Sequence, residues 1–152
     1  MARWRARQKG VVIMTLYDII QAMESIAEEQ PAVNAVVRDD IYQLNDHPDW
    51  KYGVFGYVQG QHSNVGECFI RYGFTLVYAD RINEEQDNIQ LVQSTGVQVL
   101  SNILYTLEEE FPVSVAEGVT YEVFGQRFSD NCAGVMATVG IIVPRVLKCA
   151  FN

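Results

Sequence analysis

Hydrophobic residues recur at helical spacing soon after the start of the chain. They lie three, four, seven, ten and eleven residues beyond the first of them, and they are Leu16, Ile19, Ile20, Met23, Ile26 and Ala27. This spacing forms the apolar stripe of an amphipathic helix. Thr15 and Asp18 fit a capping box at its start. Pro31 ends the helix near Glu29, because proline disfavours helical backbone in the residue before it.

A second helical pattern lies beyond the middle of the chain. Its apolar positions are Ile89, Val92, Gly96, Leu100, Ile103, Leu104, Leu107 and Phe111, and Pro112 follows them. The acidic residues within 84–87 place negative charge at the positive end of this helix. Glycine costs roughly 1 kcal/mol relative to alanine inside a helix, so we expect Gly96 to mark close packing on a sheet. The pattern predicts a helix over residues 86–110.

Between the two helices the apolar positions alternate, as they do in β-strands. Residues 33–44 predict a short strand, a turn and a second extended piece. Residues 54–61 and 68–79 predict a hairpin whose turn lies at residues 63–66. One face of its second strand is apolar or aromatic, and its members are Cys68, Ile70, Tyr72, Phe74, Leu76 and Tyr78.

Two further strands are predicted over residues 119–124 and 133–143. One face of the last strand is continuously apolar, with Ala133, Val135, Ala137, Val139, Ile141 and Val143. Its other face carries small, partly polar residues, so we expect this strand to be covered on both sides. The order α-β-β-β-α-β-β predicts an α+β domain with a mainly antiparallel sheet of four to six strands and two amphipathic helices.

The first thirteen residues differ from the rest in composition, because they carry Arg3, Arg5, Arg7 and Lys9. The apolar run that follows is too short for a signal peptide, and no small-residue cleavage site follows it. The arm is a flexible extension, a leader translated upstream of Met14, a nucleic-acid-binding arm, or a tail that docks on a neighbouring copy. We divide the chain into this basic arm (1–13), a single α+β domain (14–144) and a C-terminal tail (145–152).

The chain has a net charge of −8. Without the basic arm, residues 14–152 carry 7 basic and 19 acidic side chains, a balance of −12. A body this acidic is unsuited to wrapping nucleic acid, because that binding depends on the neutralisation of phosphates. No apolar run approaches the roughly 20 residues of a membrane helix. The charge therefore favours solubility or a basic partner surface.

The cysteines are odd in number and far apart, at Cys68, Cys132 and Cys149. Their spacing supports neither a zinc site nor a disulfide framework. We expect three unpaired thiols, which fit a reducing cytoplasm. Each of them is expected to be buried as a small apolar side chain.

Candidate catalytic chemistry is sparse. His47 and His62 are expected in turns, and His47 between Asp46 and Asp49 is a weak metal signal. Adjacent acids such as Asp39-Asp40 do not have the separated, inward-facing arrangement of a hydrolase. No nucleophile elbow, GxGxxG motif or P-loop occurs. We predict no catalytic, cofactor-binding or metal-binding residues, and a protein that is not an enzyme.

The connection between the last two strands has a distinctive composition, Gln126-Arg127-Phe128-Ser129-Asp130-Asn131-Cys132-Ala133-Gly134. Asp130 and Asn131 suit a turn, because both tolerate left-handed φ and bond their own backbone. The small residues after them allow close backbone approach, and Arg127 can pair with Asp130 or with an acidic neighbour. The segment is an ordinary hairpin connection or a contact between copies. The candidate contact residues are Arg127, Phe128, Asp130, Asn131, Glu108, Glu109, Glu110, Arg3, Arg5 and Arg7.

The order of elements and this connection together carry a family resemblance. The helix Leu16–Ala27, the hairpin through Phe69–Tyr78, the helix Gln86–Glu110 and a final hairpin closing in Val143-Pro144 resemble small tail-completion, or tail-terminator, proteins of tailed bacteriophages and prophages. Similar phage proteins carry a comparable Arg-Phe, polar, Asn, Ala-Gly turn before a last strand that closes in Val-Pro. The likeness covers roughly residues 14–144, and the segments on either side depart from it.

The resemblance implies a non-enzymatic virion structural protein of the neck or tail end. It would form a homomeric ring, a hexamer by resemblance, that completes the tail tube and joins it to the connector or portal-side neck proteins. DNA would pass through without sequence-specific binding, and no membrane would be involved. The protein would be assembled in the bacterial cytoplasm and reside in the virion. Two other functions stay open: a small cytoplasmic ligand- or protein-binding α+β domain unrelated to phage, and a small hydrolase.

Overall fold

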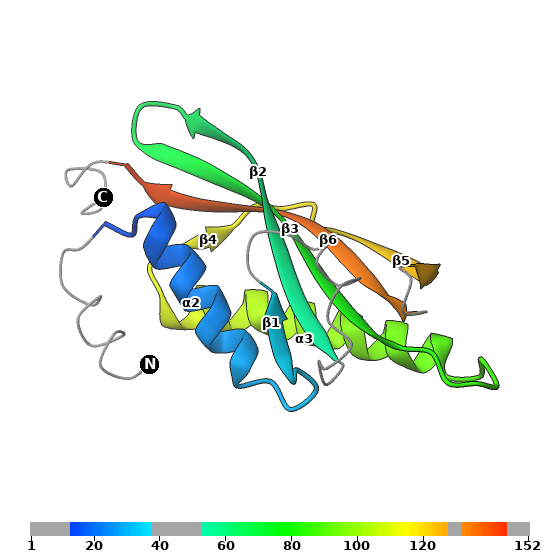
Figure 1. Cartoon of the computed structure of the whole chain (residues 1–152). Helices are drawn as coiled ribbons and strands as arrows, with labels where there is room; N and C mark the ends of the chain where they lie inside the picture. Colours follow the sequence, from blue (N-terminus) through cyan, green and yellow to red (C-terminus); the bar gives the residue numbers. More distant parts are fainter. Residues whose placement is uncertain (1–12, 38–52, 128–131, 146–152) are drawn as a thin grey trace.

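The computed structural model describes residues 13–37, 53–127 and 132–145. Within them two helices and six strands follow the order α2 (Leu16–Glu28), β1 (Ala35–Val37), β2 (Val54–Val65), β3 (Phe69–Arg81), α3 (Ile89–Glu110), β4 (Ser114–Val115), β5 (Thr120–Arg127) and β6 (Cys132–Pro144). The predicted α+β class and the predicted order of the main elements are confirmed, and the two-residue β4 is an addition. Figure 1 shows both helices on the same side of the sheet.

The six strands form one sheet whose central strands are β3 and β6. β1 pairs with β2 in parallel, and the other pairs, β2 with β3 and β6 with each of β3, β4 and β5, are antiparallel. β4 and β5 pair with different stretches of β6, since Ser114 lies opposite Ile142 and Thr120 lies opposite Thr138. The sheet is therefore mixed but mostly antiparallel, as predicted.

Helix α2 begins with the predicted capping box. The Thr15 side chain accepts a hydrogen bond from the Asp18 amide at 3.2 Å, and the Asp18 carboxylate accepts one from the Thr15 amide at 2.9 Å. Both bonds satisfy amides that have no partner within the helix. The helix ends at Glu28, three residues before Pro31, in agreement with the sequence pattern.

Helix α3 begins at Ile89 rather than at Gln86, so the predicted start is wrong. Gln86 has a φ of 57°, which lies in the left-handed region and outside an α-helix. The preceding loop is fixed instead by Asn83, whose side chain accepts a bond from the Asp87 amide at 3.1 Å. The Asn88 side chain accepts from the Asn83 amide at 2.9 Å. These contacts keep the acidic residues out of the first helical turn.

The β2–β3 hairpin is longer than predicted. Ser63 and Asn64 lie in β2 opposite Arg71 and Ile70, and the turn is centred on Gly66, whose φ is 64°. The predicted turn at residues 63–66 is therefore too early. The register shifts between residues 59 and 62, which indicates a β-bulge. The bulge lets β2 bend away from the core without ending the strand.

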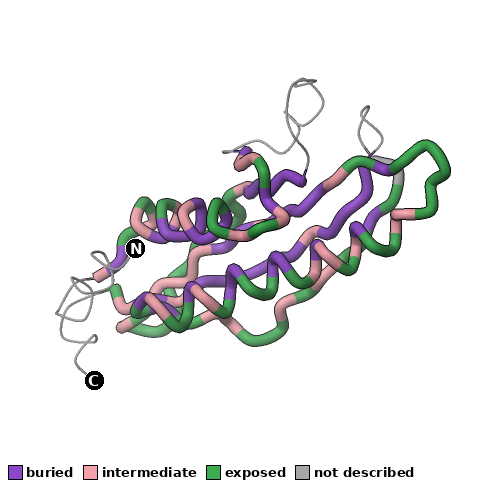
Figure 2. The backbone as a smooth tube through the Cα atoms, turned by 90° about the horizontal axis from the view of Figure 1, so that it is seen from below, coloured by how far each residue is buried: buried purple, intermediate pink, exposed green. Residues whose placement is uncertain are grey.

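The core lies between the helices and one face of the sheet. Apolar residues of α2 and α3 pack against the inward positions of β2, β3 and β6, which include Phe55, Tyr57, Phe74, Leu76, Tyr78, Val135, Ala137, Val139 and Ile141. Figure 2 views the helices from below and shows their buried positions turned toward the sheet. The alternation predicted for β3 and β6 is confirmed.

Gly96 marks the closest approach of α3 to this face, as predicted. A Cβ added at Gly96 would lie 2.8 Å from Val135 Cγ2 and 3.1 Å from Tyr78 Cδ1. These separations are shorter than the contact distance of carbon atoms. A side chain at this position would therefore push the helix away from β3 and β6.

The opposite face of the sheet is covered only in part. Near one end, Val37, Val54, Val77, Ala79, Phe124 and Cys132 form a second buried cluster. Farther along β6, Thr138 is exposed and Met136 and Ile142 are half-buried. The expectation that β6 is covered on both sides is therefore wrong at Thr138. Of the two described helices, neither lies on this face, since both belong to the core on the other side.

Candidate functional site

The outward side of α3 is a row of exposed residues with little charge. From Ile89 to Leu107 the helix has no charged residue, although the chain is strongly acidic. We define the α3 stripe by the exposed residues that share one line on the helix, Leu91, Gln98, Asn102, Tyr105 and Glu109. Their spacing of seven, eleven, fourteen and eighteen residues from the first keeps them within about 60° of one another around the helix axis. Leu91 is 69% exposed and Tyr105 is 66% exposed.

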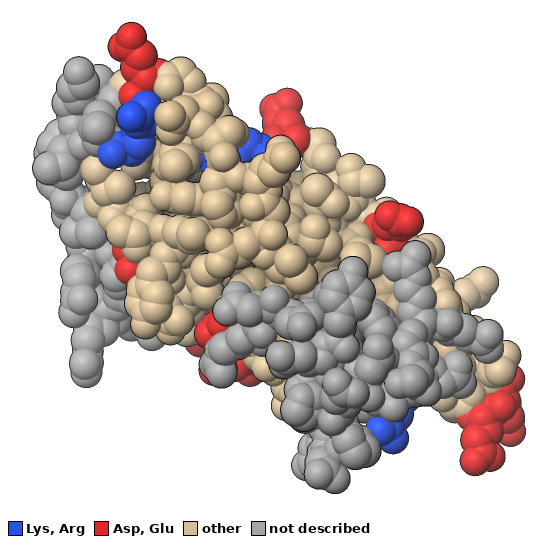
Figure 3. All heavy atoms as spheres, turned by 45° about the horizontal axis from the view of Figure 1, so that its top comes forward, with Lys and Arg blue, Asp and Glu red and all other residues tan. Residues whose placement is uncertain are grey.

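The second surface is the part of the sheet that the helices leave uncovered. We define the open sheet face by six residues, Arg71, Gly73 and Thr75 of β3 and Thr138, Gly140 and Ile142 of β6. Because the strands are antiparallel, Arg71 lies opposite Ile142. Thr75 pairs with Thr138, and Gly73 pairs with Gly140. Figure 3 turns this side forward and shows a broad area of uncharged side chains with acidic and basic groups at its margins. The surface is flat because its central side chains are small.

Arg71 lies across this flat surface. A Cβ added at Gly140 would lie 2.6 Å from Arg71 Nη2, so the guanidinium rests over the glycine. The basic side chains that the structure describes are those of Arg71, Arg81 and Arg145. Arg71 is therefore the positive group that the open sheet face presents. Its planar fork suits a carboxylate partner.

The acidic contact residues of the prediction lie at the C-terminal end of α3. Glu108 and Glu109 are exposed, and Glu110 is half-buried. Glu108 Oε1 accepts a hydrogen bond from the Val115 amide at 3.2 Å, which ties the end of α3 to β4. Glu109 continues the α3 stripe. Glu108 thus has a local structural role, and Glu109 is exposed in line with the stripe.

The four predicted contact residues within the described part of the chain lie at opposite ends of α3. Arg127 ends β5 opposite Cys132, close to the first turn of α3, because Gly125 lies against Ile89. The glutamates lie at the other end of this 22-residue helix, about 33 Å away. An intramolecular contact between Arg127 and these glutamates is therefore excluded. The remaining predicted contact residues, Phe128, Asp130, Asn131, Arg3, Arg5 and Arg7, lie outside the described residues.

A buried polar pair joins α2 to the sheet. Glu24 is 4% exposed, and Tyr57 donates its hydroxyl hydrogen to Glu24 Oε1 at 2.7 Å. A buried carboxylate requires such partners, because its removal from water is otherwise costly. The two residues are 33 positions apart in the sequence, and no local pattern singled them out.

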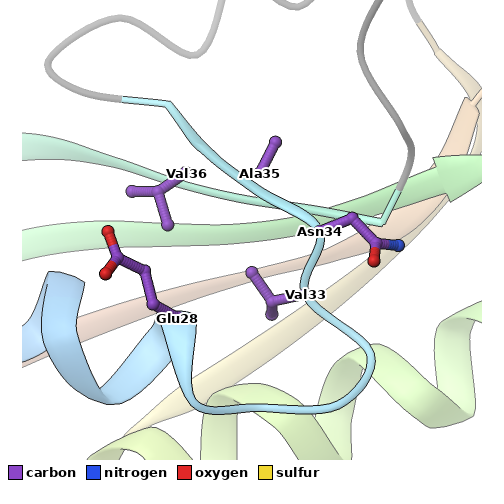
Figure 4. Close-up of a pocket in the computed structure, with 5 residues that line it drawn as sticks. All are labelled: Glu28, Val33, Asn34, Ala35 and Val36. Carbon is purple, nitrogen blue, oxygen red and sulfur yellow. The ribbon is translucent and has the colours of Figure 1, made fainter.

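A hollow of about 360 Å³ lies beside the end of α2. It is lined by Glu28, Val33, Asn34, Ala35 and Val36. Figure 4 shows the Glu28 carboxylate rising from the last turn of α2 toward Val36. The lining combines one carboxylate and one carboxamide with three apolar side chains. This chemistry can receive a small ligand with an apolar part and a hydrogen-bond donor.

Tyr78 and Asp80 carry the perturbed ionisable groups of the described core. Burial, with a smaller contribution from the Asp80 charge, raises the pKa of Tyr78 from 10.0 to about 12. Its hydroxyl donates to the Ala32 carbonyl at 3.3 Å. Burial also raises the pKa of Asp80, against the opposing effects of the Arg81 amide and charge. Both shifts arise from desolvation, which disfavours the ionised form.

His62 lies in β2 beside the bulge and not in a turn, so its predicted position is wrong. Its Nδ1 accepts a hydrogen bond from the Gly73 amide at 3.1 Å, and its Nε2 lies 3.1 Å from Gln59 Oε1. Its ring meets Tyr72 edge-on, with centroids 5.3 Å apart. These contacts give His62 a structural role in the hairpin. The other histidine, His47, lies outside the described residues.

Cys68 is disulfide-bonded, so the expectation of three unpaired thiols is wrong. The other described cysteine, Cys132, is not part of a disulfide, so the partner of Cys68 lies outside the described residues. Cys132 is fully buried, as predicted for a small apolar side chain. Among the described residues, no group of three or more His, Cys, Asp and Glu side chains is placed to hold a metal ion.

The α3 stripe and the open sheet face were not predicted from the sequence, although a signal for the first of them was present. The lack of charge from residue 89 to residue 107 is visible in the sequence, whereas exposure of Thr138 depends on which face the helices cover. No described helix combines the length and apolar character that crossing a membrane requires. No protein-family model and no curated protein matches the chain.

Proposed function

We propose that this protein is a non-enzymatic structural component of a phage tail end, where copies of it form a closed ring. The observation that carries the proposal is the presence of two surfaces with a single charged residue each, the α3 stripe with Glu109 and the open sheet face with Arg71, on opposite sides of one small domain. Interfaces between proteins are depleted of charged residues at their centre and enriched in tyrosine. The α3 stripe and the open sheet face have this character, against a chain of net charge −8.

The position of these surfaces favours a ring over a symmetric dimer. A two-fold dimer uses one surface twice, whereas a ring uses two different surfaces of each copy in head-to-tail contacts. The helices form one layer of this domain, and the sheet forms the other. Contacts through the two outer sides therefore continue from copy to copy. A closed ring forms when the rotation from one copy to the next is a whole fraction of a full turn.

The resemblance to tail-terminator proteins supplies the biological setting of the proposal. The elements on which it rests, two helices and two hairpins in this order, occur in the structure. By resemblance the ring contains six copies, ends the tail tube and receives the connector. DNA would pass through its centre without sequence-specific contacts, because an acidic surface repels phosphates. A disulfide at Cys68 is compatible with residence in a virion, where such bonds persist.

Particle mass and shape test the proposal directly. Sedimentation velocity and negative-stain microscopy of the purified chain, alone and mixed with polymerised tail tubes, are expected to show annular particles of uniform mass. A chain that stays monomeric at all concentrations and does not bind tube ends would contradict it. The neighbouring genes give an independent test: portal, capsid or tape-measure genes support the proposal, and a metabolic operon opposes it.

The hollow beside α2 favours a second candidate, a small ligand-binding domain. Its volume of about 360 Å³ lies within the range of small-molecule pockets. Screening of a fragment library by NMR is expected to shift the amides of Val33 to Val36 if the hollow binds ligands. A Glu28→Gln variant tests whether its carboxylate selects cationic fragments. Absence of any shift at these amides would rule out this candidate.

A further inference from the structure

The α3 stripe and the open sheet face, each with a single charged residue, complement each other in shape. The α3 stripe is a convex row of side chains that includes Leu91 and Tyr105, and the open sheet face is flat and built from small residues. We propose that the α3 stripe of one copy docks on the open sheet face of the next copy. The inference rests on the proposed ring and names the contact that closes it.

The layer structure of the domain explains why a helix suits this sheet. A sheet is normally covered on each apolar face by a further layer. Here both described helices cover the same face, and Thr138 on the other face is exposed. The paired Thr75 and Thr138 have short side chains, which let a helix approach this part of the face. The helical layer of a neighbouring copy would cover the part of this face that the described helices leave exposed.

One pair of opposite charges sets the register of this contact. Glu109 lies at the end of the α3 stripe, and Arg71 lies on the open sheet face. Neither forms an ion pair with another described residue. Four helical residues separate Tyr105 from Glu109, about 6 Å along the axis. Two strand residues separate Gly73 from Arg71, about 6.6 Å. When Glu109 meets Arg71, Tyr105 thus lies about two strand residues from Arg71, on the side of Thr75 and Thr138.

A second copy of this chain is the occupant that these observations favour. Both halves of the contact, including the two opposite charges, are present on the same molecule. They lie on opposite sides of it, so one copy cannot satisfy its own surfaces. A different neck or tail protein, or a symmetric sheet-to-sheet dimer, would leave the α3 stripe without its complement.

Single charged substitutions test each surface. Tyr105→Glu in the α3 stripe and Thr138→Glu on the open sheet face should each raise the concentration for half-assembly at least about tenfold, because a buried charge in an interface centre lacks a partner. Tyr17→Glu is the matched control, since Tyr17 lies on α2 and is 69% exposed against 66% for Tyr105. Circular dichroism and thermal melts verify that all three variants fold.

Mixing the two variants tests the head-to-tail arrangement. Tyr105→Glu keeps an intact sheet face, and Thr138→Glu keeps an intact α3 stripe. Each alone should be monomeric, while an equimolar mixture should form a dimer with one copy of each. A dimer of identical copies, or no dimer in the mixture, would overturn the proposed contact. The ring itself would stand if the wild type still assembles, and it would fall if the wild type is monomeric.

A charge exchange tests the register. Glu109→Arg and Arg71→Glu should each weaken assembly about threefold to tenfold, and the double variant should recover most of this loss. Additive loss in the double variant would overturn the pairing of these two residues. Glu108→Arg is the control at the neighbouring position, where the wild-type side chain bonds the Val115 amide of its own copy.

Discussion

The two faces of the sheet are made by alternate residues of the same strands, yet they are chemically different. On β3, the inward positions Phe74, Leu76 and Tyr78 are at most 2% exposed. Thr75, an outward position between them, is half-buried. Arg71 and Gly73 are the outward positions that precede it on the open sheet face. Only the inward face has enough apolar surface to hold two helices. The outward face is small and smooth, which suits a contact formed between folded molecules.

The same contrast holds for β6. Its inward positions from Ala133 to Val143 are at most 1% exposed. Outward, Gly134 and Gly140 are buried by backbone and by Arg71, and Thr138 is exposed. The inward face of β6 is apolar and buried throughout, whereas its outward face alternates glycines and an exposed threonine with the half-buried Met136 and Ile142. Substitutions on the two faces should therefore have very different effects on stability.

The largest expected effect is the loss of a core side chain facing the sheet. Leu100 of α3 is fully buried, so Leu100→Ala should lower the free energy of unfolding by about 2–5 kcal/mol. Thr138→Ala, on the open sheet face, should change it by about 0.5 kcal/mol or less. Urea unfolding followed by circular dichroism measures both. Equal effects of the two substitutions would refute the contrast between the faces.

A close backbone contact gives the next largest effect. A Cβ added at Gly134 would overlap the Tyr78 carbonyl oxygen and lie 3.0 Å from Ala79 Cα. Backbone cannot rotate away as a side chain can, so Gly134→Ala should destabilise by about 3 kcal/mol. Gly60→Ala is the matched control in β2, because its Cβ would meet its nearest atom at 3.5 Å. The control should remain within about 1 kcal/mol of the wild type, as judged from the midpoint of urea unfolding.

Tyr78 provides a test of the inward face by pH. Its pKa is raised to about 12 in the folded state from an ordinary value of 10.0, so folding favours the protonated phenol. The stability linked to this group is complete below pH 10 and is lost as the pH rises toward 12. Thermal melts from pH 8 to pH 12 should show a smaller decline in Tyr78→Phe than in the wild type. At neutral pH the variant should lose about 1 kcal/mol with its bond to Ala32.

Asp80 gives the smallest expected effect. Burial raises its pKa above 3.8, so the folded state favours the protonated carboxyl. Its contribution to stability is therefore highest below the unfolded pKa and falls as the pH rises through the folded pKa. Asp80→Asn removes this loss and should stabilise the protein at pH 7 by roughly 0.5 kcal/mol or less. The difference from the wild type should vanish in melts at pH 3, and its persistence there would contradict the assignment.

The helices and strands that are specified by local sequence patterns could be predicted without the structure. The apolar stripe from Leu16 and the capping pair Thr15 and Asp18 specify α2 without reference to any other segment. Alternation specifies β3 and β6, because side chains of a strand point to opposite faces in turn. Gly96 indicated close packing, because glycine inside a helix lowers its stability relative to alanine.

Other features depend on contacts between segments that are distant in the sequence, and only the tertiary structure shows them. Asn83 and Asn88 delay the start of α3 through contacts that periodicity does not contain. The Glu24–Tyr57 pair joins residues far apart in the sequence. The bond at Cys68 likewise depends on spatial proximity, which the separation of the cysteines concealed.

The uncovered face of the sheet belongs to the same group. The side chains of β6 alternate between two faces, and the composition of each face is compatible with burial. Only the placement of α2 and α3 on one side leaves Thr138 exposed and the α3 stripe turned outward. Periodicity is a property of neighbouring residues, whereas exposure depends on what the rest of the chain covers. For this reason the elements could be predicted from the sequence, and the surfaces proposed for assembly could not.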